Sequence, residues 1–326
     1  MRYLITGGAG FIGSHLADAL LARGDEVVAL DNLSTGRLEN IAHLRGEPRF
    51  TFVQGSVLDE LIMDELVEKC DVVVHLAAAV GVDLIIREPL RSIITNVRGG
   101  EIALAAAHRF RKKILIASTS EIYGKNGSGP LGEDADRVLG TPTVARWAYS
   151  TSKAVDEILA FAYNKERGLP TVVVRLFNTV GPRQSGAYGM VLPRFAQQAV
   201  AAESVLVYGD GLQTRCFCHV RDTVRAIVGL LDDPRAEGEV FNIGGRDEIS
   251  MQELAHRVIE AAGSPSEVSL VPYEEAYEPG FEDMRRRVPD TTRIRNLIGW
   301  EPRHDLVHII DEVIEEARKV AAVAAI

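Results

Sequence analysis

A glycine-rich turn near the N-terminus constrains the fold of this chain more than any other feature. The turn, Gly7–Gly13, separates a short apolar run, Tyr3–Thr6, from a stretch of helical periodicity, Ser14–Arg23. Glycines in a tight strand-to-helix turn let backbone N–H groups approach a pyrophosphate, and the helix N-terminus adds partial positive charge. The sequence therefore predicts a dinucleotide site formed by Gly7, Gly10, Phe11, Ile12 and Gly13.

Short apolar runs alternate with longer helical patterns through the first half of the chain. Further strands are expected at Glu26–Leu30, Arg49–Gln54, Val72–Leu76, Lys113–Ser118 and Thr171–Leu176. Helices are expected between them at Leu61–Lys69, Ser92–Phe110 and Tyr149–Arg167. Parallel strands need long crossover connections, which are usually helices. The alternation therefore predicts an α/β fold with a Rossmann-type, doubly wound parallel sheet.

The pattern changes after residue 178 to short strands, glycine and proline turns and scattered helices. Examples are Val205–Tyr208, Val240–Ile243 and Met251–Ala262, and an amphipathic helix, Asp305–Val323, closes the chain. We therefore expect a Rossmann domain over residues 1–178, with returning segments around 209–245. Residues 179–326 are expected to form mainly a smaller, discontinuous, mixed α/β domain that binds substrate.

The composition limits the partners of this chain. Its 326 residues carry a formal net charge of −10, which gives no general attraction to nucleic acid or to anionic lipid. No apolar run approaches the roughly 20 residues that a membrane span needs. The three cysteines, Cys70, Cys216 and Cys218, are too few for a disulfide framework, and a C-x-C-H cluster alone is a poor zinc site. We expect a cytoplasmic protein with no metal, nucleic-acid or membrane partner.

Acidic residues after two strands indicate how a dinucleotide would bind. Asp31 ends the second strand, where the adenosine ribose would lie, and Asn32 follows it. A carboxylate there accepts hydrogen bonds from both ribose hydroxyls and repels a 2′-phosphate, so NAD is favoured over NADP. The alternative for Asp31 is a solvated acid at a strand end. Asp59 follows the third strand and is a candidate partner of the adenine amino group.

Tyr149 and Lys153 stand four residues apart at the start of an expected helix. That spacing places both side chains on one helix face. A cation beside a phenol lowers the phenol pKa from about 10, which leaves some phenolate at neutral pH. Such a tyrosine can take a proton from a sugar hydroxyl while hydride leaves the same carbon. The pair therefore predicts a redox site.

Polar side chains also follow the fifth expected strand, as Thr119, Ser120 and Glu121. Open α/β sheets bind their ligands at the C-terminal ends of the strands. The hydroxyls can hold a substrate oxygen there, and Glu121 adds a carboxylate. The alternatives are a β-forming threonine and a helix-start acid with no part in chemistry.

Together these motifs resemble those of the NAD-dependent sugar epimerase/dehydratase family of extended short-chain dehydrogenases/reductases, over nearly all 326 residues. The segments that carry the resemblance are Thr6–His15, His75–Ala78, Ser118–Gly124, Arg175–Arg183, Gly209–Arg215, His219–Asp222 and Phe241–Gly245, with Asn96 and the Tyr149/Lys153 pair. The resemblance implies a tightly held NAD that is reduced and reoxidised within one cycle. It also implies a nucleotide-diphosphate sugar as substrate and a homodimer formed through the helices expected at 92–110 and 149–167.

The same resemblance assigns further site residues. It places Leu76, Ala77, Ala78, Asn96, Tyr149 and Lys153 at the cofactor, and Asn178, Arg215 and Arg287 near the UDP or the sugar. Arg183 could bind a uronate carboxylate in the bidentate manner that arginine favours. A structural role or a phosphate contact accounts for Arg183 equally well.

Within this family, the residues after Thr119 indicate the reaction. Dehydratases carry Asp-Glu there, and Ser120 in place of the aspartate leaves dehydration without its acid. Thr119-Ser120-Glu121 instead resembles the UDP-glucuronate decarboxylases, which share an arginine at the position of Arg287. The resemblance implies C4 oxidation, loss of CO₂ and formation of UDP-4-keto-xylose or UDP-xylose. The alternatives are a UDP-glucose or UDP-glucuronate 4-epimerase and a non-catalytic scaffold, and the retained Tyr149 and Lys153 disfavour the scaffold.

Overall fold

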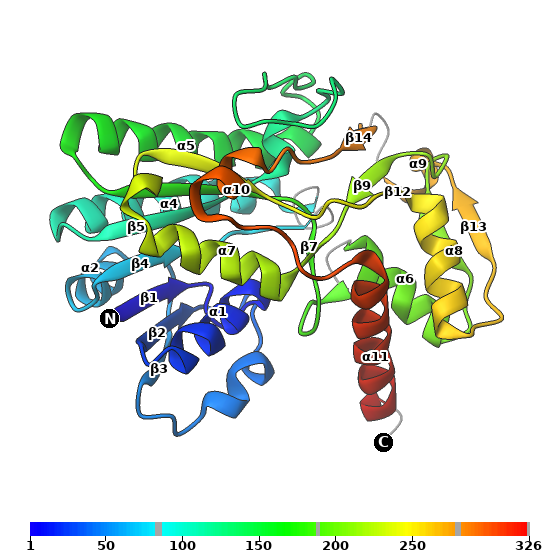
Figure 1. The fold of residues 1–326 in the computed structure, drawn as a ribbon, viewed down its shortest axis with the longest axis horizontal. Coiled ribbons are helices and arrows are strands. Elements are labelled where there is room, and N and C mark those ends of the chain that lie inside the picture. Colours follow the sequence, from blue (N-terminus) through cyan, green and yellow to red (C-terminus); the bar gives the residue numbers. More distant parts are fainter. Residues whose placement is uncertain (82–86, 187–189, 278–281, 325–326) are drawn as a thin grey trace.

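A parallel sheet of seven strands forms the centre of the computed structural model, which describes residues 1–81, 87–186, 190–277 and 282–324 (Figure 1). The strand order is β11-β6-β5-β4-β1-β2-β3, and every neighbouring pair is parallel. The strands are β1 Arg2–Thr6, β2 Glu26–Asp31, β3 Phe50–Gln54, β4 Val72–His75, β5 Lys113–Thr119, β6 Thr171–Leu176 and β11 Glu239–Ile243. The predicted doubly wound sheet is thereby confirmed.

Helices cover both faces of this sheet. They are α1 Phe11–Ala22, α2 Glu60–Glu68, α4 Pro89–Arg109, α5 Arg146–Arg167 and α7 Val220–Asp232, with short 3₁₀ helices η1 Leu38–Leu44, η2 Ser120–Tyr123 and η4 Pro234–Ala236. Successive strand residues point to opposite faces. On β1, Tyr3 and Ile5 pack into the core under α1 and α7, whereas Leu4 packs into the core under α2, α4 and α5. Apolar residues at every strand position are what a sheet buried on both faces requires.

A smaller mixed α/β part lies beside the large sheet, at the right in Figure 1. Its own buried cluster joins residues of α6, α8 and α11. The remaining elements of the described chain are β7 Thr179–Val180, α6 Val191–Val200, β8 Val205–Tyr208, β9 Thr214–Cys216, β10 Cys218–His219, β12 Glu248–Ser250, α8 Met251–Ala262, β13 Val268–Val271, α9 Tyr273–Ala276, β14 Arg286–Arg287, α10 Thr292–Ile298 and α11 Leu306–Ala324. Of these, α10 packs into the core of the large sheet, through Ile294. Both parallel and antiparallel pairs occur, with β9 antiparallel to β12 and parallel to β14.

Helices α1, α4 and α5 each begin three residues earlier than their sequence patterns predict, with α4 beginning at Pro89 rather than Ser92. Helix α1 begins at Phe11 rather than Ser14, because Gly10 is its extended N-cap and the glycine turn runs directly into the helix. Helix α5 begins at Arg146 rather than Tyr149. The difference at α5 matters for function, since it places Arg146 on the first turn of the helix that carries Tyr149.

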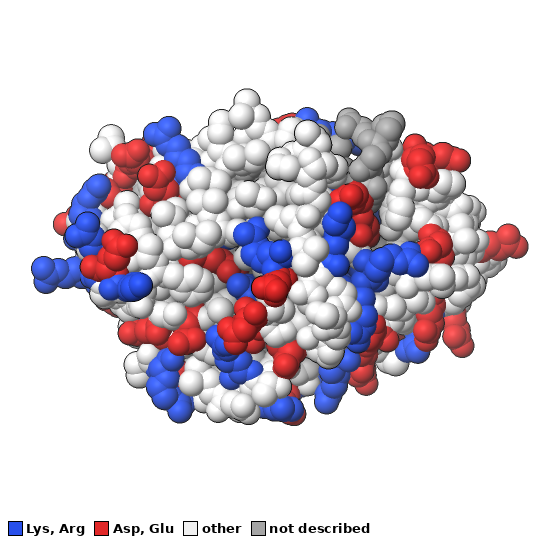
Figure 2. Space-filling model, turned by 90° about the horizontal axis from the view of Figure 1, so that it is seen from above, with Lys and Arg blue, Asp and Glu red and all other residues white. Residues whose placement is uncertain are grey.

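Acidic and basic side chains are interspersed over the face shown in Figure 2. Within the described ranges, no helix has the length and apolar character needed to cross a membrane.

Candidate active site

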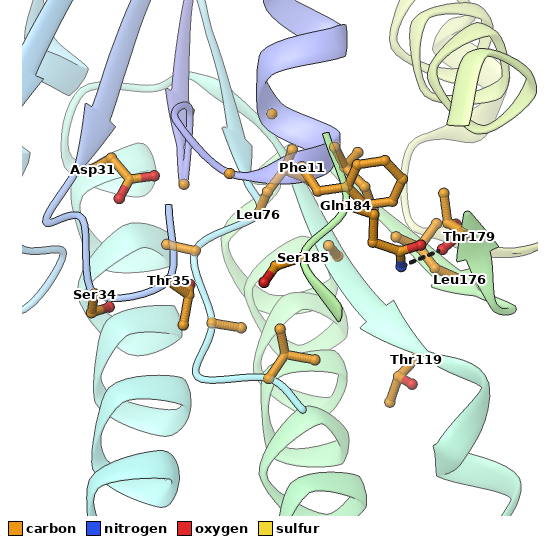
Figure 3. Close-up of a pocket in the computed structure, with 18 of the residues that line it drawn as sticks. Phe11, Asp31, Ser34, Thr35, Leu76, Thr119, Leu176, Thr179, Gln184 and Ser185 are labelled. Carbon is orange, nitrogen blue, oxygen red and sulfur yellow. Dashed lines mark hydrogen bonds between the residues drawn. The ribbon is translucent and has the colours of Figure 1, made fainter. Parts of the chain in front are cut away.

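A cleft opens at the C-terminal ends of the large sheet's strands, where the glycine turn, the ends of β2, β4 and β5, and helix α5 meet. Figure 3 shows Asp31, Ser34 and Thr35 at one end of it and Thr119 and Leu176 at the other. The sequence-predicted residues that line it are Gly7, Gly10, Phe11, Ile12, Gly13, Asp31, Asn32, Leu76, Ala77, Ala78, Thr119, Ser120, Glu121, Tyr149, Asn178, Arg183 and Arg287.

Larger residues would not fit in the glycine turn, because their side chains would collide with its backbone. Gly7 has a φ of +73°, and a Cβ on Gly13 would lie 2.2 Å from the Gly7 carbonyl oxygen. These contacts bring the start of α1 against the end of β1, with Gly10 as the helix N-cap. The turn therefore leaves open backbone at a helix N-terminus inside the cleft, which fits the phosphates of a dinucleotide.

Asp31 lies at the cleft with capacity for more hydrogen bonds. Its carboxylate accepts from the backbone N–H of Ala9 at 3.0 Å and from that of Leu33 at 2.8 Å. An ionised carboxylate has about four acceptor positions, so two donors leave room for ribose hydroxyls. Burial raises the pKa of Asp31, and the backbone N–H groups around it oppose that rise.

Two predicted cofactor residues have other contacts and do not line the cleft. Asp59 caps α2, with its carboxylate accepting from the N–H groups of Leu61 and Ile62 at 3.1 and 3.2 Å. Asn96 is buried and braces the segment after β4, because its side chain accepts from the Ala79 N–H at 2.8 Å. The structure thus brings neither side chain to the cleft surface.

Tyr149 and Lys153 share helix α5 but differ in their surroundings. Tyr149 lines the cleft and is 7% exposed, whereas Lys153 is 2% exposed and does not line it. The Lys153 ammonium lies 2.7 Å from a carboxylate oxygen of Asp156. Burial raises the pKa of Tyr149 above its usual value, and the charges of Glu121 and Asp156 raise it further. In this arrangement, burial and the two carboxylates outweigh the predicted lowering of the phenol pKa by a neighbouring cation.

Glu121 is held by an arginine on the first turn of α5. Nη1 and Nη2 of Arg146 donate to its two carboxylate oxygens, the Nη2 bond being 3.0 Å long. Arg287, on β14, approaches the same carboxylate at 3.5 Å. Burial favours the protonated form of Glu121, but the Arg146 guanidinium lowers its pKa below the ordinary value. Glu121 is therefore an ionised carboxylate at the cleft.

Arg287 lines the cleft beside Glu121 and belongs to the same buried charged cluster. Its guanidinium donates to the Asn178 side-chain oxygen, and its Nε has no hydrogen-bond partner among the described residues. Burial and the charge of Arg215 lower the pKa of Arg287 to about 10. Arg215 faces Arg287 across the β9–β14 pair and bonds Asp283 at 3.0 Å, without lining the cleft.

Arg183 lines another part of the cleft. Its guanidinium pairs with Asp18 on α1 at 2.8 Å, and its backbone N–H donates to Glu316 on α11. The structure thus ties Arg183 to the first helix and leaves the contacts of Glu121 to Arg146 and Arg287.

Several cleft residues have no role in the sequence analysis. The loop after β2 contributes Ser34, Thr35 and Arg37, and the segment after β7 contributes Gln184, Ser185 and Met190. Arg37 donates to Ser185 at 3.0 Å, so the two loops meet over the cleft. The sequence signal for the first loop is its position, since it directly follows Asp31 at the end of a strand.

Comparisons with known proteins agree with this geometry. Residues 4–313 match the family model described as GDP-mannose 4,6 dehydratase. The chain belongs to this family. It is therefore an extended short-chain dehydrogenase/reductase, as its motifs suggested.

Three relatives show where the chain lies within the family. It is 41% identical to the UDP-N-acetyl-alpha-D-glucosaminuronate decarboxylase of Bacillus cytotoxicus, over 98% of both chains. It is 34% identical to UDP-glucuronic acid decarboxylase 1 of Arabidopsis thaliana, over 98% of this chain and 70% of that protein. The structure of UDP-glucuronic acid 4-epimerase from Bacillus cereus, in complex with UDP-glucuronic acid and NAD, is 28% identical, with a TM-score of 0.88 over 98% of this chain and all of that one.

Proposed function

We propose that this protein is an NAD-dependent decarboxylase of UDP-linked hexuronates. The observation that carries the proposal is the ionised Glu121 carboxylate, clamped by Arg146 beside Tyr149 and Arg287 in the cleft. The decarboxylases of Bacillus cytotoxicus and Arabidopsis thaliana support it, because both align with almost the whole chain.

The cleft fits NAD on this chain's own residues. The open glycine turn would hold the phosphates, and Asp31 would accept hydrogen bonds from the ribose while disfavouring a 2′-phosphate. NAD bound there would accept hydride from C4 of the sugar and later return it. The NAD-containing Bacillus cereus structure supports this choice of cofactor.

Tyr149 would take the proton of the C4 hydroxyl as the carbon is oxidised. It is the titratable group at the cleft that lies one helical turn from a lysine, and Thr119 and Ser120 line the same region. Since burial raises the pKa of Tyr149, the residue needs positive charge nearby to act as a base. Lys153 is the cation that we propose for this role.

Once C4 is a ketone, the C6 carboxylate lies β to it. The C5–C6 bond can then break with its electrons flowing into the ketone, which releases CO₂ and requires a proton at C5. Arg287 has spare donor capacity at the cleft and would orient the carboxylate before it leaves. Glu121, being ionised, only accepts hydrogen bonds, so we assign it to holding the water that protonates C5 as CO₂ leaves, which makes the rate of CO₂ loss depend on Glu121.

The charge balance of the cluster favours an acidic sugar. The guanidinium groups of Arg146, Arg215 and Arg287 outnumber the carboxylates of Glu121 and Asp283 by one positive charge. A buried surplus charge is costly unless a ligand of opposite sign pairs with it. A hexuronate carboxylate supplies that sign, whereas a neutral hexose does not.

Product analysis by NMR, with purified protein, NAD and one UDP-sugar at a time, tests the proposal. UDP-glucuronate should lose CO₂ and give UDP-4-keto-xylose, UDP-xylose or both. UDP-N-acetylglucosaminuronate is the second substrate to test, because the Bacillus cytotoxicus relative is named for it. An inverted C4 centre with the carboxylate retained would instead establish a 4-epimerase, the activity named for the Bacillus cereus structure. No conversion of any UDP-sugar would reject the enzyme assignment.

We also propose a division of labour and an assembly for the chain. Residues 1–178, with the returning segments around 209–245, would hold the cofactor, and residues 179–326 would mainly hold the UDP-sugar. The protein would be a cytoplasmic homodimer that pairs through α4 and α5. Exposed apolar side chains on these helices support the pairing, with Ile93, Ile94 and Ile158 being 41%, 45% and 62% exposed.

A further inference from the structure

A carboxylate on α5 holds the lysine to which we assign a catalytic role. The Lys153 ammonium and the Asp156 carboxylate are 2.7 Å apart, and their side chains are 2% and 0% exposed. Tyr149, one turn earlier on the same helix, lines the cleft, and Lys153 does not. The lysine therefore points its charge to a partner behind the cleft surface.

Among the described residues, the hydrogen bond from Lys153 is the one polar contact that the Asp156 side chain makes. Its second carboxylate oxygen, Oδ1, makes no hydrogen bond within the described ranges. Helix α4 packs directly against it, since a Cβ on Gly100 would lie 2.3 Å from that oxygen. A buried aspartate with one unsatisfied oxygen destabilises a fold unless its cation stays close, so the pair is a costly arrangement for packing alone.

We propose that Asp156 is a positioning residue that holds the Lys153 ammonium. The cofactor and Tyr149 then have to compete with the Asp156 carboxylate for this ammonium. The inference rests on the proposed roles of Tyr149 and Lys153. An ammonium has three hydrogen-bond donors but one positive charge. A carboxylate in contact with it therefore weakens the electrostatic attraction between the ammonium and the Tyr149 phenol or a cofactor ribose.

The charged groups around the pair set the sign of the effect. Asp156 and Glu121 raise the pKa of Tyr149 after burial itself, whereas Arg146 and Arg287 lower it. Glu157, also on α5, adds its negative charge to the surroundings of Asp156. His75, on β4, is neutral, because burial and the charge of Lys153 lower its pKa to about 3.

Removing the Asp156 charge should therefore lower the pKa of Tyr149. Because the tyrosine acts as a base, the acid limb of the pH–rate profile should move to lower pH. The freed ammonium should also bind the cofactor more tightly, since it no longer has to leave a carboxylate.

A double-mutant cycle on NAD affinity tests the inference. NAD would be titrated into the wild-type protein, Asp156→Asn, Lys153→Met and the double variant, each checked by thermal unfolding. Asp156→Asn should bind NAD several-fold more tightly than wild type and move the acid limb by about one pH unit to lower pH. In the Lys153→Met background, Asp156→Asn should leave the NAD dissociation constant unchanged. Asp156→Ser replaces Asp156→Asn in the cycle if the amide variant does not fold.

Equal effects of Asp156→Asn in both backgrounds, an unchanged NAD affinity, or an unmoved acid limb would overturn the inference and leave Asp156 with a packing role. The binding cycle needs no sugar, so it decides the question even if no UDP-sugar is turned over. Conversely, suppose that UDP-glucuronate is turned over while Asp156→Asn has the same effect on NAD affinity in both backgrounds. That result would reject this inference and leave the proposed function intact.

Discussion

Asp31 ends β2 and Asp59 stands between β3 and α2, and the structure separates the roles of these two acids. Asp31 lines the cleft and has spare acceptor positions, whereas Asp59 is an N-cap away from the lining. Sequence spacing alone predicted cofactor contacts for both. It could not distinguish them, because an acid directly before a helix is equally suited to capping.

Asp31→Ala should reduce the preference for NAD over NADP. The carboxylate that would repel a 2′-phosphate is gone, and so are its bonds to the ribose. We expect the ratio of the two dissociation constants to fall by about tenfold or more, as for removal of a like-charge juxtaposition. Asp59→Ala is the matched control and should leave the ratio unchanged; an unaltered ratio in Asp31→Ala would show that Asp31 does not contact the ribose.

The junction of η2 and α5 is where the sequence prediction was least complete. Glu121 was expected at the site, but its ion pair with Arg146 (the clamp) was not, because α5 begins three residues before its apolar pattern does. Asp283 completes the cluster from a segment far away in the chain, bonding Arg215 and approaching Arg146 at 3.8 Å. Contacts of this kind depend on tertiary packing and leave no periodic signal in the sequence.

Arg146→Met should destabilise the protein by about 3–5 kcal/mol, because it leaves a buried carboxylate without its main cation. Glu121 has a lowered pKa in the folded protein, so the clamp stabilises the fold above the unfolded pKa of about 4.3 and is lost as pH falls through the folded value. The difference in free energy of unfolding between wild type and Arg146→Met, measured by denaturant unfolding, should therefore become smaller below about pH 4.

Arg257→Met is the control for that comparison. Arg257 pairs with Glu253 at the surface of α8, with both side chains about half exposed, and such pairs contribute little. A loss of stability in Arg146→Met no larger than in Arg257→Met would show that the clamp does not hold Glu121.

The sequence predicted the overall fold more completely than it predicted the candidate active site. Alternating strand and helix patterns predicted the parallel sheet, because a seven-stranded parallel sheet requires a buried run and a crossover helix for each strand. The strand Val240–Ile243 was expected from its apolar run, yet no sequence pattern placed it beside β6 at the edge of that sheet. Strand order is set by packing between distant segments.

The proposed dimer can be tested on the exposed apolar faces of α4 and α5. Sedimentation should give twice the 35.6 kDa chain mass for wild type and the single mass for Ile158→Glu, since burying a charge in an apolar contact is unfavourable. Val307→Glu changes a similarly exposed residue, 60% against 62%, on α11 and should stay dimeric. A wild-type monomer would contradict the proposed pairing.

The central claim is that Tyr149 serves C4 oxidation while Glu121 serves the loss of CO₂. Single turnovers of Tyr149→Phe and Glu121→Gln with NAD and UDP-glucuronate separate the two steps, by following reduced nicotinamide and CO₂ together. Glu121→Gln should accumulate reduced nicotinamide and release CO₂ about 100-fold more slowly than wild type, and Tyr149→Phe should form neither product at an appreciable rate. CO₂ release from Tyr149→Phe at the wild-type rate, or undiminished release from Glu121→Gln, would contradict the account.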